Sequence, residues 1–119
     1  MHYQVAPCQE TKLVRCTMGS MFAVGIDLRS ASSTFKQYFH VILTAENLRS
    51  VYIPEEFAFG YQTLADNTEV FYQMSQRFMP ECARGVRWDD PVFGIAWPND
   101  ERILLDRDRN YPDLTDEQS

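Results

Sequence analysis

Three side chains in this sequence could carry acid–base chemistry on a polar substrate: His2, Lys12 and Tyr72. An imidazole titrates near neutral pH and can take a proton, a phenol can deliver one, and a fixed ammonium stabilises a developing oxyanion. Lys12 is one of only two lysines, the other being Lys36. Each residue type also has a structural interpretation, because a terminal His is usually exposed, a strand Tyr usually packs in the core and a strand Lys is usually solvated. Residue types alone leave both interpretations open.

The stretch from Val51 to Met74 must position Tyr72, and it carries three strand signals with turn residues between them. The first, at residues 51–53, ends at Pro54. The second alternates from residue 57 to residue 64, and its aromatic face consists of Phe57, Phe59 and Tyr61, followed by Thr63. After the polar loop Ala65-Asp66-Asn67-Thr68, the third places Tyr72 on one face with Val70 and Met74. The pattern predicts a hairpin whose two strands line one concave surface with aromatic rings and the Tyr72 phenol.

Short strand patterns also fill the first part of the chain. Strands are expected at residues 2–4, 12–17, 21–28 and 38–43. Met18-Gly19-Ser20 has the residue types of a tight turn between the second and third of these strands. Beyond residue 75 the alternation stops, and the expected elements are one short strand at 85–88, an extended piece at 94–98 and one helical turn within 101–106.

Six or seven closely spaced strands with almost no helix predict an all-β fold, either a sandwich or a jelly-roll barrel. The expected domain is a single one over residues 1–119, with a solvated acidic tail at about 113–119. A fold of this kind binds its ligand where inward-facing side chains of several strands converge.

A metal centre is not expected. A metal site in a jelly-roll barrel needs two or three His residues and a carboxylate at strand spacing. This chain has two His residues, His2 and His40, which lie 38 positions apart with no His-x-His pair. Phe59 occupies the position in the segment PEEFAFG where a later His would be expected. We therefore predict no metal, and a structural role for His40.

Charge and composition restrict the partners. A net charge of -6 argues against a nucleic-acid or anionic-membrane surface, which proteins approach with clustered Lys and Arg. No apolar run approaches the roughly 20 residues of a membrane span, and no signal-peptide pattern is present. Three cysteines without Cys-x-x-Cys spacing, Cys8, Cys16 and Cys82, are typical of reduced thiols. The expected location is the cytoplasm, and Trp88 and Trp97 are expected to pack rather than to stack on a base.

Five segments follow one another in a distinctive order. They are HYQ at 2–4, KLVRCTMGSMFAVGIDLR at 12–29, TAENLRSVYIPEEFAFGYQTL at 44–64, EVFYQMS at 69–75 and RGVRWDDPVFGIAWP at 84–98. Together they resemble the dTDP-4-dehydrorhamnose 3,5-epimerase family, over roughly the C-terminal two thirds of a typical member. The resemblance implies an RmlC-like cupin jelly roll without the N-terminal strands of the family.

The resemblance also implies roles for the matching residues. The His of HYQ, here His2, is the base that removes a proton next to the sugar ketone, and the Tyr of EVFYQ, here Tyr72, delivers a proton to the opposite face. The Lys of KLVRC, here Lys12, sits near the ketone oxygen and stabilises the enolate. The segment LDRD is similar to the C-terminal Ser-x-Lys-Asp segment of the family, which gives Asp108 the role of orienting the His and Arg107 that of a neighbouring basic binding residue.

The implied activity is epimerisation of C3 and C5 of dTDP-4-keto-6-deoxy-D-glucose in dTDP-L-rhamnose biosynthesis, by a homodimer that needs no cofactor and binds a dTDP-sugar. Two alternatives remain. Phe59 stands in a substrate-binding position where the family has a second His, and Ala83 stands where it commonly has Glu, so a binding-only or inactive homologue is one alternative. The other is a mono-epimerase that acts on a different dTDP-ketosugar.

Overall fold

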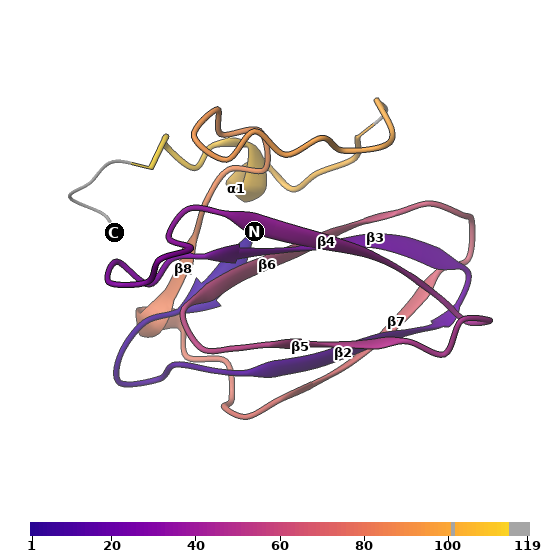
Figure 1. Cartoon of the computed structure of the whole chain (residues 1–119), viewed down its shortest axis with the longest axis horizontal. Coiled ribbons are helices and arrows are strands. Elements are labelled where there is room, and N and C mark those ends of the chain that lie inside the picture. The colour runs from indigo at the N-terminus through magenta and orange to yellow at the C-terminus, as the bar shows by residue number, and fades with distance from the viewer. Residues whose placement is uncertain (101, 115–119) are drawn as a thin grey trace.

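The computed structural model describes residues 1–100 and 102–114. Its strands form two antiparallel sheets that lie face to face (Figure 1). One sheet has five strands in the order β4-β3-β6-β1-β8, and the other has three in the order β5-β2-β7. The prediction of an all-β fold with almost no helix is confirmed.

The strands alternate with short loops over the first 74 residues. They are β1 (His2–Gln4), β2 (Lys12–Met18), β3 (Ser20–Asp27), β4 (Tyr38–Thr44), β5 (Ser50–Ile53), β6 (Phe57–Thr63) and β7 (Glu69–Met74). A short 3₁₀ turn (Pro80–Cys82), the strand β8 (Ala83–Gly85) and the single helical turn α1 (Asp106–Arg109) follow. Each strand expected before residue 75 is present, with ends that differ by no more than a few residues.

The predicted hairpin between residues 57–64 and 70–74 is wrong. β6 pairs with β1 and β3, whereas β7 pairs with β2 in the other sheet. The connection between β6 and β7 is held on the β2–β3 turn, because Leu64 donates its backbone N–H to Ser20 and the Thr68 hydroxyl bonds to Ala65 and Ser20. The connection therefore carries the chain from one sheet to the other, so that the inward faces of β6 and β7 belong to opposite sheets instead of lying side by side in one sheet.

Two further predictions are displaced. The last strand is Ala83–Gly85 rather than 85–88, because pairing with β1 ends where His2 lies opposite Gly85. Residues 94–98 belong to neither sheet. The helical turn expected within 101–106 is α1, which begins at Asp106, and residue 101 lies outside the described part. Of the predicted tail, residues 115–119 lie outside it too.

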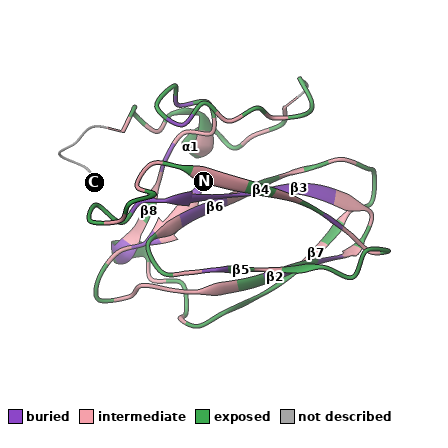
Figure 2. Cartoon of the chain, in the orientation of Figure 1, coloured by how far each residue is buried: buried purple, intermediate pink, exposed green. Residues whose placement is uncertain are grey.

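Apolar side chains fill two layers. Successive residues of β3 face opposite sides, so Met21 and Ala23 pack between the sheets, whereas Phe22 and Val24 pack on the outer face of the five-stranded sheet. The chain beyond β8 covers that outer face, and Trp97 packs there, as expected (Figure 1). β3 is consequently buried from Met21 to Asp27, while the three-stranded sheet keeps an exposed outer side (Figure 2).

Among the described residues, no helix has the length and apolar character needed to cross a membrane.

His40 lies on β4 and stacks on Phe22, with 5.1 Å between the ring centroids.

Candidate active site

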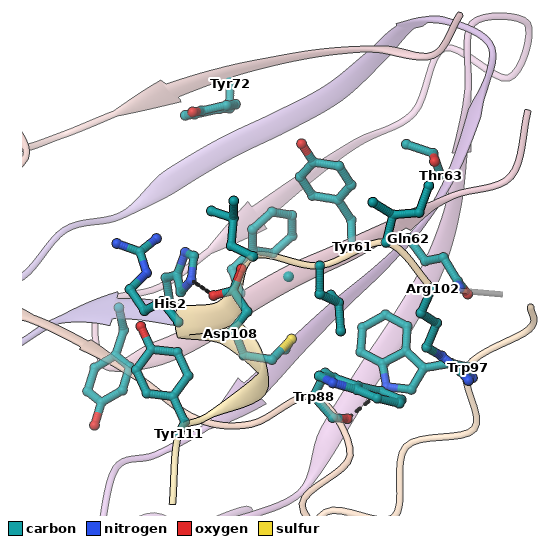
Figure 3. Close-up of a pocket in the computed structure, with 18 of the residues that line it drawn as sticks. His2, Tyr61, Gln62, Thr63, Tyr72, Trp88, Trp97, Arg102, Asp108 and Tyr111 are labelled. Carbon is teal, nitrogen blue, oxygen red and sulfur yellow. Dashed lines mark hydrogen bonds and ion pairs between the residues drawn. The ribbon is translucent and has the colours of Figure 1, made fainter. Parts of the chain in front are cut away.

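A cleft of about 1380 Å³ lies between the two sheets and the segment that carries α1 (Figure 3). All six residues that the sequence analysis assigned to a site line it. They come from five elements: His2 from β1, Lys12 from β2, Phe59 from β6, Tyr72 from β7, and Arg107 and Asp108 from α1. The fold thus gathers side chains that are up to 106 positions apart in the sequence.

Strand alternation explains why these side chains meet. On the three-stranded sheet, Lys12 shares the inward face of β2 with the buried Val14, and Val14 lies directly opposite Tyr72. On the five-stranded sheet, His2 lies opposite Phe59, which also packs between the sheets. His2 therefore enters the cleft from one sheet and Tyr72 from the other, as Figure 3 shows.

His2 is held by a short hydrogen bond from Nε2 to Oδ1 of Asp108, at 2.6 Å. Because the carboxylate oxygen accepts, Nε2 carries the proton and Nδ1 keeps a lone pair that can take another. Burial lowers the pKa of His2 below its usual value, and Asp108 partly opposes this effect. A lowered pKa keeps the imidazole in its basic form at neutral pH, which is the form that a proton-abstracting group needs.

Contacts of the chain that follows α1 hold Asp108 within reach of His2. The Arg87 guanidinium donates to the backbone carbonyl of Tyr111 and forms an ion pair with Asp113. Leu114 donates its N–H to a carboxylate oxygen of Asp90, at 2.7 Å. The beginning of the predicted tail is thus tied to the body of the protein, and it fixes the position of the helical turn.

Gly85 contributes to the same arrangement. A Cβ at this position would lie 2.2 Å from the Tyr111 ring, so only glycine leaves room for that ring against β8. The ring then lies edge-on to His2, with 6.3 Å between the centroids. Tyr111 was not among the residues predicted from the sequence to have a role.

Lys12 is almost buried, with 11% of its side chain exposed. Its Nζ donates to the backbone carbonyl of His2 at 3.4 Å, lies 3.5 Å from Oε1 of Glu10 and sits 5.6 Å from the centre of the Phe59 ring. Burial lowers the pKa of Lys12, and the Glu10 carboxylate opposes this shift. A cation in so dry a place can stabilise a negative oxygen strongly.

Tyr72 is half-exposed, and a second phenol, Tyr61 of β6, points toward it (Figure 3). Burial raises the pKa of Tyr61, and the proximity of Tyr72 adds to the effect. Tyr61 lies on the aromatic face of the alternating pattern, so its position in the cleft could be predicted from the sequence. Its proximity to Tyr72 could not.

The far end of the cleft has its own polar contacts, which the sequence analysis missed. The Arg102 guanidinium lies 4.6 Å from the centre of the Trp88 ring. Gln62 and Asn99 exchange two hydrogen bonds, at 3.1 and 3.2 Å. Within the described part of the chain, no three His, Cys, Asp or Glu side chains gather closely enough to hold a metal ion.

A two-sheet jelly roll whose cleft holds a His–carboxylate pair, a buried Lys and a facing Tyr defines a class of proteins equipped for acid–base chemistry on a bound ligand. The comparison with known families narrows that class. The chain belongs to the dTDP-4-dehydrorhamnose 3,5-epimerase family, which matches residues 1–116.

Individual relatives agree with this assignment. The dTDP-4-dehydrorhamnose 3,5-epimerase of Shigella flexneri is 39% identical over 116 residues, which are 98% of this chain and 64% of the relative. The crystal structure of the Bacillus anthracis enzyme with TDP and PPi bound is 39% identical, with a TM-score of 0.92 over 95% of this chain and 65% of that one. ChmJ, a 3'-monoepimerase from Streptomyces bikiniensis in complex with dTDP-quinovose, is 34% identical, with a TM-score of 0.85 over 94% and 57% of the two chains.

These similarities confirm the RmlC-like cupin fold that the sequence motifs implied. The chain spans less than two thirds of the length of each of these relatives.

Replacing Asp108 should change the titration of His2 in a defined direction. Since Asp108 raises the pKa of His2 through its hydrogen bond and its charge, Asp108→Asn should lower that pKa further, so that the imidazolium forms only at a more acidic pH. NMR titration of the His ring protons measures this, with the His40 signals as an internal reference. Asp106→Asn, an exposed carboxylate in the same helical turn, is the matched control and should shift His2 much less. An unchanged or raised His2 pKa in Asp108→Asn would contradict the geometry.

Proposed function

We propose that this chain catalyses the epimerisation of C3 and C5 of dTDP-4-keto-6-deoxy-D-glucose, a step of dTDP-L-rhamnose biosynthesis, without a cofactor. The observation that carries the proposal is the arrangement of the cleft. The His2–Asp108 pair enters from one side, Tyr72 enters from the other sheet, and Lys12, on the strand next to that of Tyr72, is almost buried with its Nζ 3.4 Å from the His2 carbonyl. Family membership and the named relatives support the choice of substrate.

The C4 ketone of this sugar acidifies the hydrogens on both C3 and C5, so one carbonyl serves two inversions. Nδ1 of His2 takes a proton from the ring carbon, and Asp108 supports the imidazolium that forms. The resulting charge lies on the C4 oxygen, where the buried Lys12 ammonium stabilises it. Tyr72 then delivers a proton to the opposite face of the same carbon, which inverts its configuration.

Two other residues serve binding in this proposal. Arg107 is exposed at the rim of the cleft beside Asp108, and its guanidinium would pair with the diphosphate of the dTDP group. Phe59 offers no hydrogen bond to the sugar. Its ring lies under the Lys12 ammonium and beside Tyr61, so its role is to shape the cleft and hold the cation.

Proton exchange with the solvent tests the proposal. Proton NMR of the purified 119-residue protein with dTDP-4-keto-6-deoxyglucose in deuterated water should show label at C3 and C5. The label should vanish in His2→Ala, because no other group takes the ring proton. A folded protein that introduces no label would indicate the binding-only alternative and end the proposal of catalysis.

Label at C3 alone would identify the second alternative, a mono-epimerase. The similarity to ChmJ gives this candidate specific support, because a 3'-monoepimerase has the same fold at 34% identity. The proposal of two inversions would then be wrong, although the roles of His2 and Tyr72 at C3 would stand.

Tyr72→Phe should separate exchange from inversion. Without an acid on the opposite face, a carbanion formed by His2 is reprotonated from the side of His2, so deuterium enters with retention of configuration. Inversion should fall by roughly 10²- to 10⁴-fold, the usual contribution of a positioned acid. Tyr61→Phe removes the phenol that points toward Tyr72 and is the matched control, which should still invert. Equal loss of exchange and inversion in Tyr72→Phe would argue against this role.

We also infer a homodimer that works in the cytoplasm, the compartment in which Cys8, Cys16 and Cys82, all free thiols, would stay reduced. Leu13, Tyr52 and Phe71 are exposed together on the outer side of the three-stranded sheet, where Leu13 lies opposite Tyr52. An apolar surface of this kind favours association between chains.

Sedimentation at micromolar concentration should show a dimer, and Leu13→Lys should shift it to the monomer. Leu48→Lys is the matched control, because Leu48 is more exposed but lies in the turn before β5. A monomeric wild-type chain would contradict the inference, and cell fractionation tests the location.

A further inference from the structure

Glu10 is a charged residue of the cleft that the proposed mechanism does not use. It lies two positions before β2 and lines the cleft beside Lys12. Only 7% of its side chain is exposed. A carboxylate this far from water is costly unless each of its oxygens finds a donor.

Among the described residues, only one of the two carboxylate oxygens of Glu10 has a partner. Oε1 lies 3.5 Å from Nζ of Lys12, which is an ion pair longer than an ordinary hydrogen bond. Oε2 is buried, and no described residue donates a hydrogen bond to it. Lys12 also has unused capacity, since an ammonium has three donors and its other polar contact, to the His2 carbonyl, is 3.4 Å long. The pair therefore presents an unsatisfied acceptor next to an unsatisfied cation.

We propose that Glu10 and Lys12 together recognise an α-hydroxyketone, with Oε2 of Glu10 accepting a hydrogen bond from the hydroxyl next to the ketone. An ammonium matches a ketone oxygen, which only accepts, and a carboxylate matches a hydroxyl, which can donate. In the proposed substrate these groups are the C4 ketone and the 3-hydroxyl. The inference thus rests on the proposed function and adds a specificity-determining residue to it.

This arrangement also directs the charge during proton removal. When His2 takes the proton from C3, the negative charge of the enolate is shared between C3 and the C4 oxygen, where Lys12 stabilises it. The Glu10 carboxylate, bonded to the 3-hydroxyl, disfavours loss of the hydroxyl proton, because two negative charges would then lie side by side. Glu10 is therefore both a binding group for the substrate and a positioning residue for Lys12.

Binding of two ketones to a protein that cannot turn them over tests the inference. The ligands are dTDP-4-keto-6-deoxyglucose and its 3-deoxy analogue, and the background variant is His2→Asn. With Glu10 present, the 3-hydroxy ketone should bind roughly ten- to hundredfold more tightly than the 3-deoxy ketone, the usual worth of a hydrogen bond to a charged group. Glu10→Gln should reduce this ratio to a few-fold, and Glu10→Ala should bring it close to one.

Glu46→Gln, an exposed carboxylate in the β4–β5 turn, is the matched control and should leave the ratio unchanged. Circular dichroism establishes whether each variant is folded. If Glu10→Gln is not folded, Glu10→Asp, which keeps the charge, is used in its place. A ratio that is the same with and without Glu10, equal weakening of both ketones, or a failure of the 3-hydroxy ketone to bind would overturn the inference.

The result of this binding test can be told apart from the result of the solvent-exchange test of the proposed function. Solvent exchange by the wild-type protein with an unchanged ratio in Glu10→Gln would leave the epimerase and remove the role of Glu10. A Glu10-dependent ratio in a protein that exchanges no ring hydrogen would leave the recognition of an α-hydroxyketone and remove the epimerase.

Discussion

The hydrogen bond between His2 and Asp108 is the interaction on which the rest of the site depends. It joins the first strand to the last helical turn, across 106 positions of sequence, and closes one side of the cleft. The bond fixes the imidazole tautomer, which leaves Nδ1 as the basic atom. The ion pair of Arg87 with Asp113, the bond from Leu114 to Asp90 and the bare backbone of Gly85 all serve to hold the segment that supplies Asp108.

The second constraint is the alternation of side chains along strands in two facing sheets. Because successive residues point to opposite faces, the buried Val14 fixes the direction of Lys12 and, through cross-strand pairing, that of Tyr72. The pairing of His2 with Phe59 does the same for the opposite sheet. In the proposed mechanism, the base and the acid come from different sheets and reach a ligand in the cleft from different sides, which is the geometry that inversion of a carbon requires.

The electrostatics of the cleft follow from burial more than from net charge. The chain carries a net charge of -6, yet its cleft holds Lys12 and Arg107. Burial lowers the pKa of both His2 and Lys12, and in each case a neighbouring carboxylate partly restores it. Asp108 therefore lies beside the base His2, and Glu10 lies in the same way beside the cation Lys12. In the proposed mechanism, Asp108 preserves the proton affinity of His2 and Glu10 preserves the positive charge of Lys12.

Sequence reasoning reached the all-β fold and the inward faces of β6 and β7, because an alternating pattern depends only on neighbours in the chain. It failed on the pairing of β6 with β7, because partner choice depends on distant contacts such as those of Leu64 and Thr68 with Ser20. His2, Lys12 and Tyr72 were candidates by residue type, whereas Asp108 and Arg107 came from family resemblance alone. Glu10 and Tyr111 carried no signal, since a loop carboxylate and a ring near the end of the chain gain their place only from folding.

A crystal structure of the chain with bound dTDP-4-keto-6-deoxyglucose, in the His2→Asn variant to prevent turnover, tests the opposed arrangement of base and acid most directly. The sugar ring should lie with C3 and C5 between the side chain at position 2 and the Tyr72 hydroxyl, and with the C4 oxygen within hydrogen-bonding distance of Lys12 Nζ. A sugar that presents the same face of its ring to both side chains, or that places its ketone away from Lys12, would contradict this mechanism.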